Sequence, residues 1–367
     1  MLLYTTICCR RKASNMATND QFSGQFKVLT QDQVDQRQLD HLTSYPRGGA
    51  HLNITNYCSR PWHTVTINPD GECYTCICSS WLPVSVGNIE SFARLEDIWN
   101  NPRSNVLQQT ITDNNYTYCA VNHCGIIDHP LTMETYTINL SVDESCNLAC
   151  PSCRREAVNI TSGPAFDKKS KMVEHITRLL TEFKEPMELI MISSGDPLSS
   201  LIMRPLVLNW VPMPNQQITL FTNGLLMKKL LPSSSILPNI SNFWISIDAG
   251  SKDVYENVRR PGKYHILREN LDWLAENKSK DTGVLLKFTV SAGNAADIMN
   301  FCNLCEHYGF RGDITNVDDN RTWDNFNDHE VITNNSHPLH SVAVEQLKQA
   351  SVLPYIELSP FFNNIVR

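Results

Sequence analysis

The chain has 367 residues, with 31 Lys and Arg against 38 Asp and Glu, so its formal net charge is −7. This acidic balance provides no basic footprint for duplex nucleic acid, and no apolar run approaches the about 18 residues that a membrane-spanning helix needs. The 13 cysteines are grouped in tight local clusters. In a long chain without an export signal, such grouping favours metal binding in a reducing cytoplasm over a secreted disulfide framework.

Changes in composition divide the chain into four expected segments. Residues 1–45 are polar, rich in glutamine and weakly periodic, which predicts a disordered tail. A small cysteine-rich module is expected at residues 46–130, and an alternating strand-and-helix region at residues 131–320. The remainder, residues 321–367, is expected to be a C-terminal extension.

The cysteine-rich module begins with Cys58 and an alternating run at residues 63–68. The turn sequence Asn68-Pro69-Asp70-Gly71 and a second short run at residues 72–78 follow, which together predict a β-hairpin. A helix is expected from Arg94 to about Gln109. Units this small are commonly held together by metal. The cysteines available for this are Cys58, Cys73, Cys76, Cys78, Cys119 and Cys124.

From Thr135 onward strand and helix patterns alternate, which predicts a parallel α/β architecture. The expected strands are residues 136–142, 188–192, 217–221, 242–247, 284–290 and 313–317. The expected helices include residues 167–183, 264–276 and 295–308. In parallel α/β barrels the chemistry lies at the carboxyl ends of the strands. The polar motifs that follow these strands are therefore the candidate site.

The first strand is followed by Cys146-Asn147-Leu148-Ala149-Cys150-Pro151-Ser152-Cys153. Thiolates in this C-x3-C-x2-C spacing can hold three corners of a [4Fe–4S] cluster and leave one iron open for another ligand. A zinc site is the alternative interpretation. Zinc sites, however, favour C-x2-C pairs and a closed set of four ligands.

Three further motifs follow the next strands. Ser193-Ser194-Gly195-Asp196-Pro197 combines a glycine, which lets the backbone approach a ligand, with a carboxylate that can pair with an ammonium group. Thr222-Asn223-Gly224 ends the third strand, and it is as consistent with a plain strand-to-helix turn as with a role at the candidate site. Ser246-Ile247-Asp248-Ala249 ends the fourth strand and precedes Tyr255-Glu256-Asn257-Val258-Arg259-Arg260-Pro261-Gly262-Lys263. In this motif Asp248 either faces a substrate or caps the following helix.

The triad and these motifs resemble the radical S-adenosylmethionine (SAM) superfamily, in the right order and on the expected elements. The resemblance implies a partial (β/α)6 TIM-type barrel and a [4Fe–4S] cluster on Cys146, Cys150 and Cys153, with SAM bound to the open iron. The family's Gly-Gly-Glu-Pro motif, which binds the SAM amino group, is matched by Ser194, Gly195 and Asp196, with Ser and Asp as departures. It further implies contacts to SAM from Asn223, Ser246 and Arg259.

The module ahead of this region resembles the SPASM and twitch domains, through Cys58-x12-Gly71-x4-Cys76 and the Gly-Asn-Ile that follows. These domains hold auxiliary [4Fe–4S] clusters. The longer SPASM cysteine series is reduced here to Cys119-x4-Cys124, which favours one auxiliary cluster. The implied ligands are Cys58, Cys76, Cys119 and Cys124, with Cys73 and Cys78 as competitors and structural zinc as the alternative. In the family this module normally follows the barrel.

The resemblance implies an enzyme that cleaves SAM reductively to a 5′-deoxyadenosyl radical, which abstracts hydrogen from a substrate C–H bond. A peptide or protein substrate is favoured over a sugar, nucleoside or other small molecule, and flavodoxin or ferredoxin is the expected reductant. A non-catalytic iron–sulfur electron carrier or scaffold is the interpretation of another class. Cys302 and Cys305, on one apolar helix face, are expected in the core.

Overall fold

The computed structural model describes residues 56–76, 85–119, 130–192 and 194–365. The expected N-terminal tail, Cys78 and Cys124 lie outside the described residues. The described part divides into two compact units. Unit 1 comprises residues 143–173 and 189–365, and unit 2 comprises residues up to 142 together with residues 174–188.

Unit 1 is built on a sheet whose strands follow one another in chain order, from β5 to β10. The pairings from β6 to β10 are all parallel. The strands are β5 (Met187–Met191, shared with unit 2), β6 (Gln216–Thr222), β7 (Ile240–Ser246), β8 (Gly283–Val290), β9 (Arg311–Asn316) and β10 (Ile356–Leu358). This order confirms the expected α/β class, and only the three-residue β10 was not anticipated.

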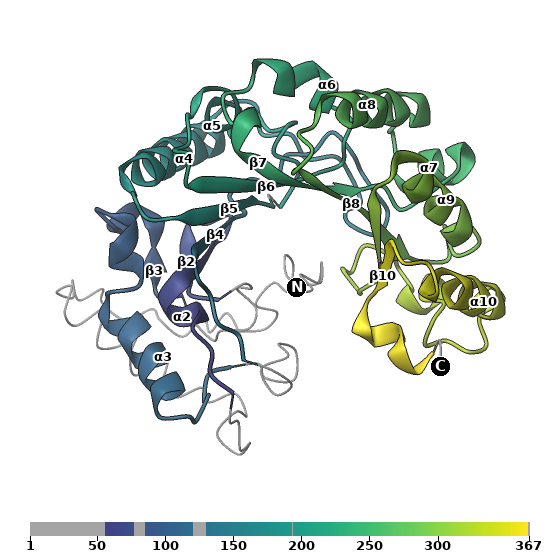
Figure 1. Ribbon diagram of the computed structural model, residues 1–367, viewed down its shortest axis with the longest axis horizontal. Coiled ribbons are helices and arrows are strands. Elements are labelled where there is room, and N and C mark those ends of the chain that lie inside the picture. The colour runs from purple at the N-terminus through teal and green to yellow at the C-terminus, as the bar shows by residue number, and fades with distance from the viewer. Residues whose placement is uncertain (1–55, 77–84, 120–129, 193, 366–367) are drawn as a thin grey trace, which may run out of the picture. The chain divides into compact units, whose positions relative to one another are not determined.

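Helices connect these strands and lie along one face of the sheet (Figure 1). The α-helices are α4 (Pro164–Glu182, shared with unit 2), α5 (Arg204–Asn209), α6 (Met227–Leu230), α7 (Lys252–Val258), α8 (Tyr264–Asn277), α9 (Ile298–Tyr308) and α10 (His340–Ser351). Short 3-10 turns are η7 (Leu231–Ser233), η8 (Leu237–Asn239), η9 (Phe326–Asp328) and η10 (Pro360–Asn364). A strand, a returning helix and a parallel neighbour form the repeating unit expected of a barrel.

The core of unit 1 lies between the sheet and these helices. Phe288 of β8 and Phe301 of α9 are fully buried, and their ring centroids are 5.0 Å apart. Cys302 and Cys305 are fully buried as well, which confirms their expected place in the core. A Cβ atom at Gly312 would lie 2.6 Å from Ile356 and 2.9 Å from the Cys305 sulfur, so β9 packs too closely here for a larger residue.

The opposite face of this sheet carries polar and aromatic side chains. Lys287 of β8 forms an ion pair with Asp313 of β9, and both are almost completely buried. The Lys287 ammonium group lies 5.7 Å from the ring centroid of Trp244, whose ring meets Phe221 edge to face. A buried ion pair contributes little net stability, so stability alone does not account for the polar side chains on this face.

Unit 2 contains a mixed sheet in the order β4-β1-β2-β3. Its strands are β1 (Thr64–Ile67), β2 (Glu72–Tyr74), β3 (Gly87–Asn88) and β4 (Tyr136–Leu140). The predicted hairpin is confirmed, since β1 and β2 pair antiparallel. A pairing that the sequence did not reveal is the parallel one between β1 and β4, the first of the six expected barrel strands.

The expected helix from Arg94 to about Gln109 is interrupted. The chain forms α2 (Arg60–His63), η4 (Ile89–Ser91), η5 (Leu95–Ile98) and α3 (Pro102–Thr112). The Asn101 side chain accepts hydrogen bonds from the backbone N–H groups of Arg103 and Ser104, and Pro102 occupies the first turn of α3. These two residues start a new helix, because asparagine caps and proline at the first position favour a helix start.

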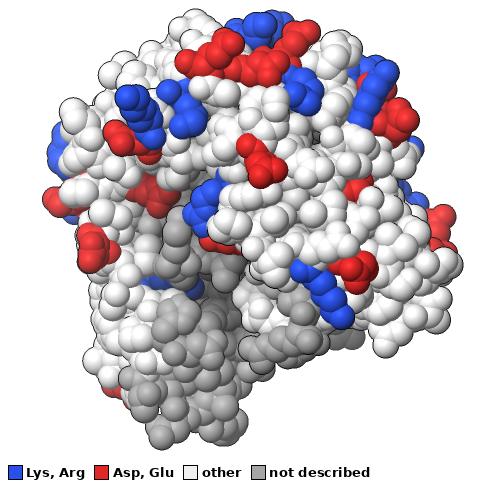
Figure 2. All heavy atoms as spheres, turned by 45° about the vertical axis from the view of Figure 1, so that its right-hand side comes forward, with Lys and Arg blue, Asp and Glu red and all other residues white. Residues whose placement is uncertain are grey.

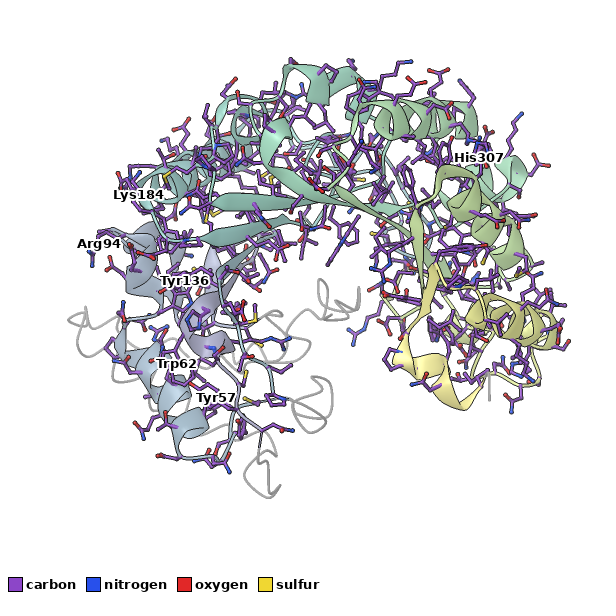
Figure 3. All side chains as sticks on the ribbon, viewed as in Figure 1. Tyr57, Trp62, Arg94, Tyr136, Lys184 and His307 are labelled. Atoms are coloured by element: carbon purple, nitrogen blue, oxygen red, sulfur yellow. The ribbon has the colours of Figure 1, made fainter. Side chains whose placement is uncertain are left out.

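An aromatic cluster forms the core of unit 2. The Tyr136 ring lies 4.9 Å from Trp99 and 5.1 Å from Phe183, measured between centroids, and Tyr136 is labelled in Figure 3. The Trp99 indole N–H donates to the carbonyl of Thr64 at 3.1 Å, so its buried polar group is satisfied. Unit 2 therefore has an apolar core besides its cysteines.

On the face shown in Figure 2, acidic and basic side chains are interspersed. Across the ranges that the structure covers, every helix is either too short or too polar to cross a membrane.

Replacing Phe301 by alanine is expected to lower the free energy of unfolding by about 3–5 kcal/mol, because a buried aromatic side chain and its contact with Phe288 are lost. Chemical denaturation measures this change. Val211, which is 71% exposed, provides the control, since Val211→Ala removes almost no buried surface. Equal stability of the two variants would contradict the packing described for α9.

Candidate metal centre

The three cysteines of the C-x3-C-x2-C motif lie on one short loop in unit 1, residues 146–153, here called the cluster loop. Cys146 and Cys150 are buried, and Cys153 is half-buried. The backbone N–H of Cys153 donates to the carbonyl of Cys150 at 2.9 Å, which tightens the turn between them. The thiols are close enough that Cys150 affects the pKa of Cys146, and Cys153 that of Cys150.

Two N–H groups point at the sulfur of Cys146. The backbone N–H of Leu148 donates to it at 3.4 Å, and the side-chain amide of Asn223 donates at 3.8 Å. The same amide of Asn223 also donates to the side-chain oxygen of Asn147 at 2.8 Å. The turn after β6 is thereby attached to the cluster loop, and Asn223 is one of the residues that the sequence singled out.

Each of the other two thiols has a guanidinium group nearby. Arg259 donates from Nη1 to the Cys150 sulfur at 3.6 Å, and Arg154 lies close enough to Cys153 that this thiol raises the pKa of Arg154. Hydrogen bonds and positive charge at cysteine sulfurs stabilise the thiolate form that a metal requires, and in iron–sulfur proteins they set the reduction potential. All three sulfurs therefore have surroundings suited to thiolates.

Burial raises the pKa of Cys146 to about 11, with a further contribution from the charge of Asp196. Burial also raises the pKa of Cys150, although the Arg259 guanidinium opposes this shift. Without metal these two thiols are protonated at neutral pH. Metal binding at the cluster loop therefore releases protons and becomes stronger as the pH rises.

The cluster loop offers three thiols as possible metal ligands. No three His, Cys, Asp or Glu side chains within the described residues form a group that could hold one metal ion. A closed zinc site needs four ligands that converge on one point. In an iron–sulfur cluster each thiolate binds its own iron atom, so Cys146, Cys150 and Cys153 suit a [4Fe–4S] cluster with one iron left without a protein ligand.

The Ser-Gly-Asp-Pro loop packs directly on the start of the cluster loop. A Cβ atom at Gly195 would lie 2.0 Å from the carbonyl oxygen of Ser145, a distance that no side chain permits. The N–H of the next residue, Asp196, donates to the same carbonyl at 2.8 Å. Arg154 fixes the other side, since its guanidinium donates to the carbonyls of Glu144 and Ser194, both at 2.8 Å.

The carboxylate of Asp196 is occupied by hydrogen bonds from its own surroundings. One oxygen accepts from the N–H groups of Leu198 and Ser199, at 3.0 and 3.1 Å. The other accepts from the Thr222 hydroxyl at 2.8 Å and the Asn223 N–H at 2.7 Å. These bonds fill its usual acceptor capacity of about four. Burial raises the pKa of Asp196, and these hydrogen bonds oppose that shift. The Asp196 side chain thereby orients the turn that contains Asn223.

Arg259 has a partner that the sequence did not reveal. It forms an ion pair of 2.8 Å with Asp248, and the two side chains are only 12% and 9% exposed. Asp248 has a left-handed backbone with φ of 51° and is held by the Thr289 N–H at 2.7 Å and by Asn294, which donates to its carbonyl. The sequence signal that could have indicated this pair is an acid at the end of a strand, Asp248, followed by an arginine after the next helix, Arg259.

The surroundings of Arg259 also change the pKa of its guanidinium group. Burial would lower the pKa of Arg259, but Asp248 and Cys150 more than compensate and raise it. Burial raises the pKa of Asp248, and Arg259 opposes the shift. The Nε atom of Arg259 is buried and has no hydrogen-bond partner within the described residues. One donor on this side chain therefore remains for a bound group.

The neighbouring Arg260 and the end of β7 complete the surroundings of the cluster loop. The carbonyl of Arg260 accepts from the N–H of Ala149 at 2.6 Å, so the segment after α7 is attached to the loop as well. Ser246, the last residue of β7, is half-buried beside Lys287 in the strand register. Its hydroxyl makes no hydrogen bond within the described part of the chain.

In unit 2, Cys58 and Cys119 share an apolar cluster with Ile111, Tyr116 and Leu131. Burial raises the pKa of Tyr116 to about 12, and the two thiols contribute to the shift, Cys58 more than Cys119. Next to Cys58 the rings of Tyr57 and Trp62, both labelled in Figure 3, are stacked with centroids 5.9 Å apart. The structure therefore brings together two of the expected auxiliary ligands.

The remaining thiols of the module differ in their surroundings. Cys76 is half-buried just after β2, where its carbonyl accepts from the Thr66 hydroxyl at 2.7 Å. Cys73 is fully buried in the hairpin, and burial raises its pKa well above the usual value. A thiol buried in this way behaves as a core residue, which favours Cys76 over Cys73 as a ligand.

Comparison with known protein families identifies this module. Residues 58–125 match the SPASM family, described as an iron–sulfur cluster-binding domain. The module is therefore similar to SPASM domains. The match includes all four expected auxiliary ligands, and it confirms that in this chain the SPASM-like module lies ahead of the strand-and-helix region. No curated protein matches the chain.

Several solved structures are similar to the chain. Streptococcus suis SuiB bound to precursor peptide SuiA is 13% identical over 62% of this chain and 49% of its own, with a TM-score of 0.40. Native anSMEcpe with bound AdoMet is 16% identical over 50% and 52%, with a TM-score of 0.36. TYW1 with a lysine-pyruvate adduct is 17% identical over 47% and 61%, with a TM-score of 0.30. The chain therefore spans roughly half to three fifths of the length of these proteins.

The buried pair of Arg259 and Asp248 generates a prediction on stability. Arg259→Gln leaves the Asp248 carboxylate buried without its counter-ion, which is expected to lower the free energy of unfolding by about 3 kcal/mol. Adding Asp248→Asn to that variant is expected to cost less than the sum of the two single changes, because both remove the same interaction. Chemical denaturation of the four proteins measures the coupling.

Arg178→Gln serves as the control, since Arg178 and Glu182 form an ion pair whose side chains are 46% and 53% exposed. Such exposed pairs contribute less than about 1 kcal/mol. Strictly additive effects of the Arg259 and Asp248 changes would show that the pair does not act as a unit.

Proposed function

We propose that this chain is a radical SAM enzyme, in which the cluster loop holds a [4Fe–4S] cluster that cleaves SAM. One observation carries the proposal. Three segments that are far apart in the sequence converge on the cluster loop through Gly195, Asn223 and Arg259, and each corresponds to a motif of that superfamily. A simple electron carrier needs the three thiols and a further ligand but has no use for these motifs.

When bound, the cluster would supply the electron for reductive cleavage of SAM and one open iron to anchor it. The protein's own residues position the other groups. Cys146, Cys150 and Cys153 bind the cluster, and the donors around their sulfurs tune it. The role of the surrounding residues is to hold SAM in one orientation and to keep water away from the reacting atoms.

The residues around the loop divide this task. Ser194 and Gly195 present backbone close to the loop, and the Asp196 carboxylate, whose oxygens are taken up by its own neighbours, holds Asn223 in place. The free Nε donor of Arg259 suits a carboxylate. The free hydroxyl of Ser246 suits a ribose or carboxylate oxygen. We assign the binding of SAM to this set.

For the substrate we propose a peptide or protein, with flavodoxin or ferredoxin as the reductant. The SPASM match supports this class, because the SPASM-associated branch that the sequence resembles commonly modifies peptides. The SPASM-like module would hold one auxiliary [4Fe–4S] cluster on Cys58, Cys76, Cys119 and Cys124. In that arrangement the module either passes electrons or binds the substrate.

Replacing Cys146, Cys150 and Cys153 together by alanine is expected to abolish SAM cleavage, because the protein ligands of the cluster are removed. The measurement is 5′-deoxyadenosine formation by chromatography after anaerobic reconstitution with iron and sulfide and reduction with dithionite. Cys302→Ala, which removes a buried core thiol instead, should retain cleavage. No 5′-deoxyadenosine from the unmodified protein would refute the proposed function.

The auxiliary cluster is tested by the iron content of the reconstituted protein. Replacing Cys58 and Cys119 by serine is expected to lower it by about four iron atoms per chain, the content of one [4Fe–4S] cluster, while 5′-deoxyadenosine is still formed. Cys73→Ser is the matched control within the same module and should leave the iron content unchanged. Unchanged iron in the double variant would show that these two thiols bind no cluster.

A further inference from the structure

A cavity of about 540 Å³ lies against the cluster loop in unit 1. Residues from four segments line it. They lie within residues 149–155 (the end of the cluster loop and the two residues after it), 257–260 (the end of α7 and the residues after it), 291–293 (after β8) and 322–329 (in the C-terminal extension). None of the residues that we assign to SAM lines this cavity. It shares one wall with the proposed metal centre but is formed by other side chains.

The cavity is positively charged in an acidic protein. Arg154, Arg155 and Arg260 line it, and the lining includes no Asp or Glu, whereas the whole chain has a net charge of −7. Arg154 is held by backbone carbonyls and acts as a fixed charge. The Arg260 side chain is exposed, and Arg155 is 64% exposed. Two exposed guanidinium groups beside a fixed one provide a site for carboxylates.

The one acid that contacts these arginines is easily replaced. Asp324 pairs with Arg155 at 3.0 Å, but the side chain of Asp324 is 96% exposed. Ion pairs that are this exposed contribute little stability. A carboxylate that enters the cavity can therefore compete with Asp324 for the Arg155 guanidinium.

An aromatic surface lies next to the charges. The rings of Trp323 and His329 are stacked, with centroids 4.4 Å apart and planes inclined by 14°. The neighbouring Thr322 hydroxyl is buried and has no hydrogen-bond partner within the described residues. A flat aromatic face beside an unused polar group suits a peptide, which offers apolar side chains together with backbone donors and acceptors.

The residue just before this extension is attached to the cluster loop, because the side-chain amide of Asn320 donates to the Ser152 carbonyl at 2.8 Å. A group bound in the cavity would lie beside the loop on which the radical is generated. We propose that the cavity binds an acidic segment of the peptide substrate, with its carboxylates on Arg155 and Arg260 and an apolar side chain on Trp323. This inference rests on the proposed function.

The test uses the full-length, anaerobically reconstituted protein and a fluorescein-labelled peptide of alternating Glu and Phe residues. Fluorescence anisotropy measures its dissociation constant, and a peptide with Gln in place of Glu is the reference. We expect the acidic peptide to bind more tightly, and the double variant Arg155→Gln/Arg260→Gln to weaken its binding by about tenfold or more. Trp323→Ala should weaken both peptides.

The matched control is Arg94→Gln/Arg178→Gln, which removes two exposed arginine charges from unit 2 (side chains 69% and 46% exposed) and should leave binding unchanged. Equal affinity for the two peptides, or equal losses in the two double variants, would overturn the inference. Displacement of the peptide by SAM or by adenosine monophosphate would also overturn it, because the cavity would then belong to a nucleoside.

Formation of 5′-deoxyadenosine in the absence of peptide separates this inference from the proposed function. If the unmodified protein forms 5′-deoxyadenosine but does not prefer the acidic peptide, only the assignment of the cavity fails. If it forms none, the proposed function fails whatever the peptide binding.

Discussion

The close backbone approach between Gly195 and Ser145 is the constraint on which the rest of the candidate site depends. No side chain fits at residue 195, because a Cβ atom would lie 2.0 Å from the Ser145 carbonyl oxygen. The approach places Asp196 where its carboxylate reaches the end of β6, and so sets the position of Asn223. Asn223 in turn donates to Cys146. One steric requirement thus links the ends of two strands to Cys146.

Electrostatics connects the other side of the loop to the sheet. Arg259 lies between the Cys150 sulfur and the Asp248 carboxylate, and the site is largely buried. Placing a cation there is costly unless an anion is near. Asp248 supplies this anion, and thiolates bound to a cluster would supply more negative charge. The arrangement is therefore suited to a loop that carries negative charge when metal is bound.

The SPASM-like module shares its sheet with a strand that we expected to belong to the barrel. β1 pairs in parallel with β4, the segment that leads into the cluster loop. Its apolar core of Trp99, Tyr136 and Phe183 includes residues from well outside the range that matches the family. The module therefore depends on later parts of the chain for its folding, which hydrophobic patterning alone does not reveal because each strand has several possible partners.

The sequence by itself determined the six main strands, the hairpin, the core position of Cys302 and Cys305 and the motifs at the candidate site. These features follow from local periodicity, from turn residues and from cysteine spacing, so they can be read without knowledge of distant contacts.

Other features depend on residues brought together from distant parts of the chain. Only the tertiary structure decided that Asp248 pairs with Arg259, that the Asp196 carboxylate is filled by its own neighbours, and that three arginines and Trp323 line one cavity beside the cluster loop. Those pairings are set by how the strand ends meet, and that geometry is fixed only when the sheet and helices pack.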